Sequence, residues 1–178
     1  GHAREAEAEA EAVGVAAERL GYAPLLAEAR LLAGRIAMEG NGWQVAVDAL
    51  RQAQVAATAG GHDAIAAEAM ARRLYVEGVI EGRREAALGE RALAEAWVAR
   101  VGRPGLEALL ANNIGMLLRL GGDVAGAHER FAFALDADSV RRTAAALRPL
   151  IDAETLVVAS SDFTHYGPRF GYLPFTRD

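Results

Sequence analysis

The residues best suited to chemistry are an aspartate and a histidine near the carboxyl end, Asp162 and His165. They follow the apolar run 155–159, Thr-Leu-Val-Val-Ala, whose composition predicts a buried strand. Ligands of α/β folds gather beyond the carboxyl ends of strands, so the loop that carries this carboxylate and this imidazole is the best candidate for a chemical site. An aspartate after a strand also commonly caps a turn, and this alternative stays open.

One carboxylate and one imidazole do not complete a transition-metal site, which usually has three or four protein ligands. The chain has no cysteine, and neither His62 nor His128 has a second histidine close by in sequence. We therefore expect neither a working metal site nor catalysis in this chain.

Composition indicates a helical chain without a nucleic-acid or membrane role. Of the 178 residues, 52% are hydrophobic but only 6% are aromatic, so alanine supplies much of the apolar content and favours helices. A net charge of −5 leaves no basic excess to neutralise phosphates. No apolar run approaches the roughly 20 residues that span a bilayer. We expect a soluble, cytoplasmic protein, which the absence of cysteine fits.

Turn residues recur at nearly constant spacing along the first three quarters of the chain. Two interleaved series have steps of 40 or 41 residues: Asn41, Gly82 and Gly122, and Gly21, Gly61 and Gly102. Small and apolar positions recur 81 residues apart, with Ala46, Leu50 and Ala53 matching Ala127, Phe131 and Ala134. The middle copy is weaker, because Arg91 takes the Leu50 position and Tyr75 stands where the outer copies have Gly34 and Gly115.

Between these turns the sequence predicts a series of antiparallel helices. Residues 3–20 are rich in alanine and glutamate and favour a first helix. The helices expected after it are Pro24–Met38, Trp43–Ala57, Ala64–Val79, Arg84–Arg100, Leu106–Leu120 and Val124–Leu135. Trp43 and Trp97 are expected to anchor the core or a groove rather than to stack on a cofactor.

Two segments resemble the tetratricopeptide signature of Leu-Gly, Gly, Ala, Phe and Ala. They are Leu32-Ala33-Gly34 with Ala46, Leu50 and Ala53, and Ile114-Gly115 with Gly122, Ala127, Phe131 and Ala134. A standard repeat has about 34 residues, so this spacing implies longer helices. The amino-acid sequence of these segments is also similar to helical arrays that follow kinase domains in bacterial serine/threonine kinases. The resemblance implies a solenoid of antiparallel helix pairs, about three repeats over residues 1–138, that acts as a protein-interaction or scaffold module.

In such a module the concave groove would hold a protein or peptide partner. Asn112 and Asn113 lie on the first helix of a pair, where amides can hold a partner's backbone. The arginines expected to bind partner carboxylates are Arg72, Arg73 and Arg119. Simple solvation of these side chains is the open alternative. An incomplete array exposes apolar faces at its ends, so self-association is also expected.

The last forty residues are similar to a different family. Leu147-Arg148-Pro149-Leu150 and the string 156–172, which contains Ser-Ser-Asp-Phe-Thr-His-Tyr-Gly-Pro-Arg-Phe-Gly-Tyr, resemble the Memo family, or AmmeMemoRadiSam system protein B. The resemblance implies that residues 139–178 are a fragment of an α/β fold related to class III extradiol dioxygenases. It also implies copper- or iron-linked redox chemistry, with Asp162 and His165 lining the pocket.

The chain departs from that family outside this string. Members draw further histidines from His-Ala-Gly-Tyr-like and Ser-His-His-like segments, and often a later cysteine, which this sequence lacks. We therefore expect no cofactor. The alternative function, a truncated Memo-like metal-associated redox protein, would need those missing ligands.

Overall fold

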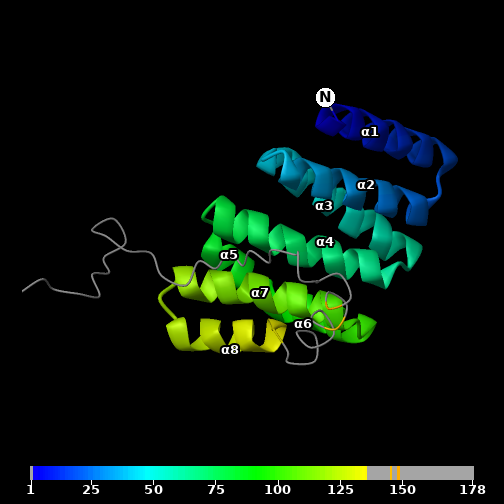
Figure 1. Ribbon diagram of the computed structural model, residues 1–178. Helices are drawn as coiled ribbons and strands as arrows, with labels where there is room; N and C mark the ends of the chain where they lie inside the picture. Colours follow the sequence, from blue (N-terminus) through cyan, green and yellow to red (C-terminus); the bar gives the residue numbers. More distant parts are fainter. Residues whose placement is uncertain (1, 136–144, 146–147, 149–178) are drawn as a thin grey trace, which may run out of the picture. The chain divides into compact units, whose positions relative to one another are not determined.

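The computed structural model describes residues 2–135 together with Ala145 and Arg148. The chain divides into two units, Gly1–Asp136 and Ala137–Asp178. The helices described below all belong to the first unit (Figure 1). The predicted strand 155–159 and the rest of the predicted α/β fragment fall outside the described residues, apart from those two positions in the second unit.

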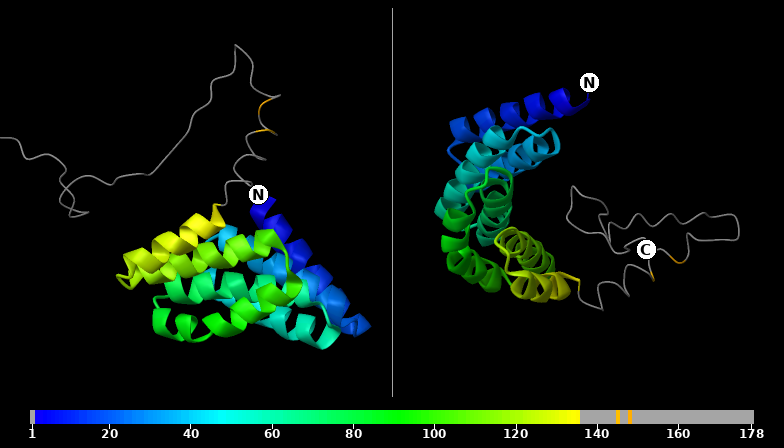
Figure 2. Two further views of the ribbon diagram at one scale, coloured as in Figure 1. Left: turned by 90° about the horizontal axis from the view of Figure 1, so that it is seen from below. Right: turned by 90° about the vertical axis from the view of Figure 1, so that its left-hand side faces the viewer.

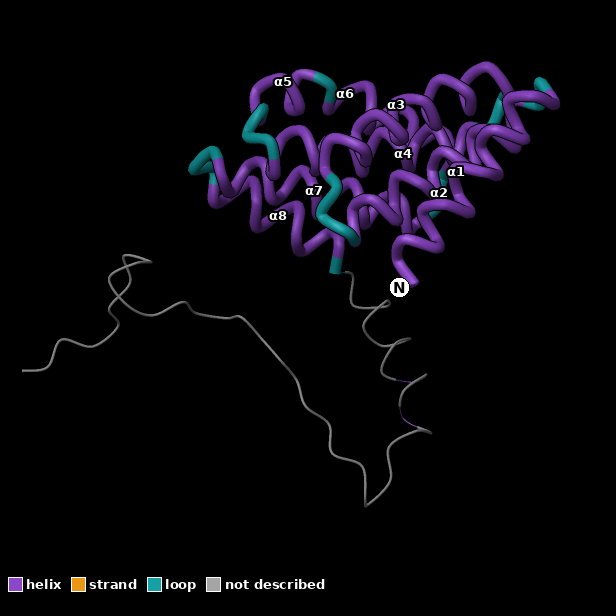
Figure 3. The backbone as a smooth tube through the Cα atoms, turned by 90° about the horizontal axis from the view of Figure 1, so that it is seen from above, coloured by secondary structure: helices purple, strands orange, loops and turns teal. Residues whose placement is uncertain are grey.

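The first unit is built from helices joined by short loops (Figure 3). Over the described residues there is no strand, and the mainly helical prediction is confirmed. The elements are α1 (His2–Leu20), α2 (Ala23–Glu39), α3 (Trp43–Gly60), α4 (Asp63–Tyr75), the π-helical turn η1 (Val76–Ile80), α5 (Arg84–Gly89), α6 (Arg91–Val101), α7 (Pro104–Leu120) and α8 (Val124–Ala134).

The turns between these helices use the residues that the repeat predicted. Left-handed backbone, with φ between 59° and 84°, occurs at Asn41, Gly21, Gly61, Gly82, Gly102 and Gly122, and at no other described residue. A Cβ atom disfavours this conformation, which glycine and, to a lesser degree, asparagine tolerate. The spacing of 40 or 41 residues is therefore set by where the chain must reverse.

Within the outer helix pairs, a glycine lets two helices approach closely. A Cβ atom added at Gly34 in α2 would lie 2.8 Å from Cγ of Leu50 in α3. One added at Gly115 in α7 would lie 2.7 Å from the Phe131 ring in α8. Leu50 and Phe131 are the equivalent repeat positions, so both pairs pack through the same kind of contact.

The middle pair differs from the outer ones. The helix predicted over Ala64–Val79 is present, but its last turn, η1, is π-helical. The single helix predicted over Arg84–Arg100 was wrong, because it breaks at Glu90. The close approach also moves three residues along, because a Cβ atom at Gly78, not at position 75, would meet Ala87 at 2.7 Å. A π-helical turn inserts extra backbone and so shifts which residue faces the neighbouring helix.

The helices of this unit follow one another along an arc (Figure 2). Figures 1 and 2 together place α2, α4 and α7 along the inner side of that arc. The core has two clusters, one centred on Leu50 and one on Met70, Leu74, Ile114 and Leu117. α4 contacts α3, α6 and α7, so it lies at the middle of the packing.

Replacing Gly34 by alanine is expected to lower the free energy of unfolding by about 1–3 kcal/mol, since Leu50 is fully buried and cannot move aside. Gly105 in α7 is the matched control, because a Cβ atom there meets nothing within 4 Å. Gly105→Ala should be neutral or stabilising by up to about 1 kcal/mol. Urea denaturation measures both variants, and equal effects would show that the Gly34 contact does not set the helix spacing.

Candidate functional site

A groove on the inner side of the arc is formed by α2, α4 and α7. Its volume is about 280 Å³. It is lined by Met38 from α2, by Arg72 and Tyr75 from α4, and by Leu109, Asn112, Asn113 and Met116 from α7. We call it the inner groove. It brings together three of the predicted partner-binding residues, Arg72, Asn112 and Asn113.

Among the described residues, Arg72 is the only charged one that lines the inner groove. Its Nε donates a hydrogen bond to Oε1 of Glu68, one turn earlier on α4, at 2.8 Å. Within the described part of the chain, the Nη groups of Arg72 have no hydrogen-bond partner. A guanidinium that is oriented through Nε but has free Nη groups is suited to bind a carboxylate.

The two asparagines have different roles. Asn113 is buried, and its Nδ2 donates to the main-chain oxygen of Ala71 at 2.9 Å, which joins α7 to α4. Asn112 is exposed, and its Nδ2 lies 3.4 Å from Oδ1 of Asn113, close to the limit of a hydrogen bond. Asn113 therefore holds the two helices together, whereas Asn112 is an exposed amide on the lining of the groove.

The rest of the lining is apolar and adaptable. Met38, Leu109 and Met116 are half-buried and come from the two helices on either side of α4. Methionine is flexible and polarisable, so it adapts to side chains of different shape. Tyr75 lies in the groove instead of between a helix pair, because Gly78 makes the close approach in this repeat.

The other predicted site residues lie elsewhere. Arg119 is exposed on α7 and does not line the inner groove. Arg73 is buried on another side of α4, so it is not available to a partner. Asp162 and His165 lie outside the described residues. In the part that is described, no group of three or more histidine, aspartate or glutamate side chains is arranged to hold a metal ion.

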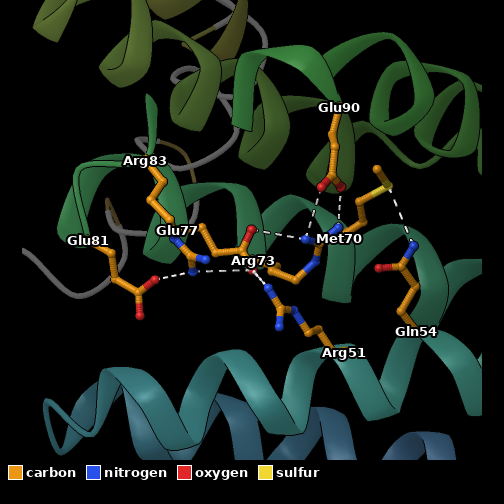
Figure 4. Close-up of polar contacts among 8 residues, drawn as sticks. All are labelled: Arg51, Gln54, Met70, Arg73, Glu77, Glu81, Arg83 and Glu90. Atoms are coloured by element: carbon orange, nitrogen blue, oxygen red, sulfur yellow. Dashed lines mark hydrogen bonds and ion pairs between the residues drawn. The ribbon is translucent and has the colours of Figure 1, made fainter. Parts of the chain in front are cut away.

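Arg73 is the centre of a network of charges in the middle of the stack (Figure 4). Its Nη1 lies 3.0 Å from Oε2 of Glu77 in η1, and its guanidinium also binds the carboxylate of Glu90, at the break between α5 and α6. Oε1 of Glu77 accepts a hydrogen bond from Nη2 of Arg51 in α3 at 2.7 Å, and Arg83 lies 3.7 Å from it. The network thus joins α3, α4, η1 and the residue where the next helix breaks.

Electrostatics keep the buried guanidinium charged. Burial alone would lower the pKa of Arg73, but the hydrogen bond to Glu90 and the charges of Glu77 and Glu90 together raise it above its usual value. Arg73 therefore stays protonated at any pH at which the protein is handled. The i,i+4 spacing of Arg73 and Glu77 was visible in the sequence, but the approach of Glu90, 17 residues away from Arg73, was not.

Comparison of the chain with family models, with curated proteins and with solved structures gives no match. Among the helices described, none is both long and apolar enough to cross a membrane.

Arg73→Met is expected to lower the free energy of unfolding by about 3 kcal/mol, because it removes the buried cation that Glu77 and Glu90 share. Arg91→Met is the matched control. It removes a half-exposed i,i+4 pair with Glu95 and should cost no more than about 0.5 kcal/mol. Chemical denaturation compares the two, and similar losses would mean that the network does not stabilise the stack.

Proposed function

We propose that this chain is a non-catalytic protein-interaction module made of tetratricopeptide-like helix pairs, which holds a peptide segment of a partner protein in the inner groove. The observation that carries the proposal is the groove itself. A single cation with free donors, an exposed amide and three adaptable apolar side chains converge there from three helices.

The repeat architecture is supported by the backbone and by the packing. Left-handed turns recur at the repeat spacing, and Gly34 and Gly115 make equivalent close contacts in the outer pairs. The proposed repeats are α2 with α3, α4 with α5 and α6, and α7 with α8. Stacked pairs of this kind present a fixed inner surface, which lowers the entropic cost of binding an extended segment.

The lining suggests the chemistry of the partner. Arg72 would bind a carboxylate, Asn112 would bond the peptide backbone, and the methionines with Leu109 would receive an adjacent apolar side chain. Arg119, two turns after Asn112 on α7, adds a further cation for an acidic residue. Asn113 contributes by fixing the helices, and its burial removes it from direct backbone binding. The burial of Arg73 removes that residue from the proposed contacts.

The same proposal includes a protein or peptide partner, a cytoplasmic location and no nucleic-acid role. Self-association also stays a prediction, and exposed apolar residues at both ends, such as Leu20 and Phe133, support it. The Memo-like alternative with copper or iron depends on Asp162 and His165, and no observation on the described residues favours it.

The test begins with a random peptide library selected on the full chain. Selected peptides should carry aspartate or glutamate beside an apolar residue. Arg72→Glu should weaken their binding roughly tenfold or more, because it replaces a charge-assisted contact by repulsion, and Asn112→Ala should weaken it less. Fluorescence polarisation with labelled peptides measures the dissociation constants.

Arg103→Glu provides the matched control, because Arg103 is exposed at the start of α7 and lies away from the inner groove. It changes the net charge as Arg72→Glu does and should leave binding unchanged. Peptides that bind the Arg72 and Arg103 variants equally well, or a selection that yields no binding peptide, would count against the groove.

A further inference from the structure

A second groove lies between α1 and α3, with α2 as its floor. Its volume is about 460 Å³, and most of the surface lining it is apolar. Leu26 of α2 lies on the floor, and Val55, Ala56 and Ala59 of α3 form one wall. Val55 is 71% exposed, so this wall presents an apolar side chain to solvent. We call this hollow the outer groove.

One repeat further along, the corresponding place is occupied by a tryptophan of this chain. Trp97 of α6 packs against both core clusters, including the one that α2, α3 and α4 form together. Its ring lies under the guanidinium of Arg100, 5.8 Å from the ring centre, and Arg100 is held by Asp63 at 2.7 Å. The indole therefore fills the space between α6 and α3 above α4.

The repeat register shows why the outer groove is open. The turns at Gly61 and Gly102 place position 56 of α3 in register with position 97 of α6, and position 59 in register with position 100. Ala56 and Ala59 thus stand where the next repeat has Trp97 and Arg100. Both alanines line the outer groove, so the space that a large side chain fills in the middle of the stack is empty here.

The charges around the outer groove are largely compensated. Arg30, which lines it, donates to Glu11 at 2.9 Å and to Glu18 at 2.6 Å on α1. A Cβ atom at Gly14 would lie 3.2 Å from Cζ of Arg30, so this glycine gives the guanidinium room to cross α1. Glu18 also lines the groove and is half-exposed, which leaves a carboxylate available to accept an indole N–H.

We propose that the outer groove is a docking site for a partner protein that inserts a tryptophan side chain beside Ala56. The site continues the internal interface that Trp97 makes one repeat later, with the aromatic group supplied from outside. Tryptophan is also the side chain that most often dominates protein interfaces, through burial of a large ring in a pocket. The site is separate from the inner groove, so it stands independently of the proposed peptide-binding function.

The first experiment uses N-acetyl-tryptophanamide as the probe and methyl NMR of the full chain as the readout. Titration should shift the methyl signals of Leu26, Val55, Ala56 and Ala59 selectively. Ala56→Trp should weaken binding of the probe roughly tenfold or more, because the introduced indole occupies the groove. Ala92→Trp, at an exposed position on α6 that lines neither groove, is the matched control and should bind the probe as wild type does.

A second variant keeps the proposal testable if Ala56→Trp does not fold. Val55→Glu places a charge on the groove wall at a side chain that is already exposed, so the fold should persist while probe binding falls. Shifts spread over the whole surface, or binding that survives both substitutions, would overturn the proposal.

A peptide selection then tests whether the occupant is a protein. Selection on the full chain, with removal of peptides that also bind Ala56→Trp, should enrich tryptophan, and those peptides should bind the Arg72→Glu variant normally. Binding of the free probe without enrichment of tryptophan-containing peptides would contradict a protein docking site. Loss of the selected peptides in Arg72→Glu would place them in the inner groove and would also contradict it.

Discussion

The rest of the structure depends on a positive charge buried in the middle of the stack. A guanidinium removed from water is costly unless anions compensate it, and Arg73 obtains two, from Glu77 and Glu90. The backbone departs from a regular α-helix at both anions. Glu77 lies in the π-helical turn η1, and the helix predicted to run through position 90 breaks there. With Arg73 buried on one side of α4, its neighbour Arg72 and the nearby Tyr75 line the inner groove.

Both grooves follow from the way in which helix pairs stack. Small residues bring paired helices together, and turns of constant spacing return the chain to the same register. The helices that come first in each pair then line the inner side, where Asn113 bonds α7 to α4. The second helices lie on the other side, where a large residue fills the space between neighbours at Trp97 and a small one leaves it open at Ala56.

The sequence predicted what local chemistry determines and missed what distant charges determine. Helices and reversals were readable because alanine, glutamate, glycine and asparagine have strong backbone preferences. The π-helical turn and the break at Glu90 were not predicted, and the pairing of Glu90 with Arg73, 17 residues earlier in the chain, was not readable from local patterns either. Arg72 and Asn112 line the inner groove, whereas the burial of Asn113 and Arg73 could not be foreseen, because helix rotation follows from packing.

Amide hydrogen exchange of the full chain, compared between wild type and Arg73→Met, tests the central role of this charge most directly. Helical stacks open in local units, so the account predicts that exchange accelerates first and most from α4 through α6, while α1 and α2 change little. Exchange that is unchanged in that segment, or that accelerates equally along all the helices, would contradict it.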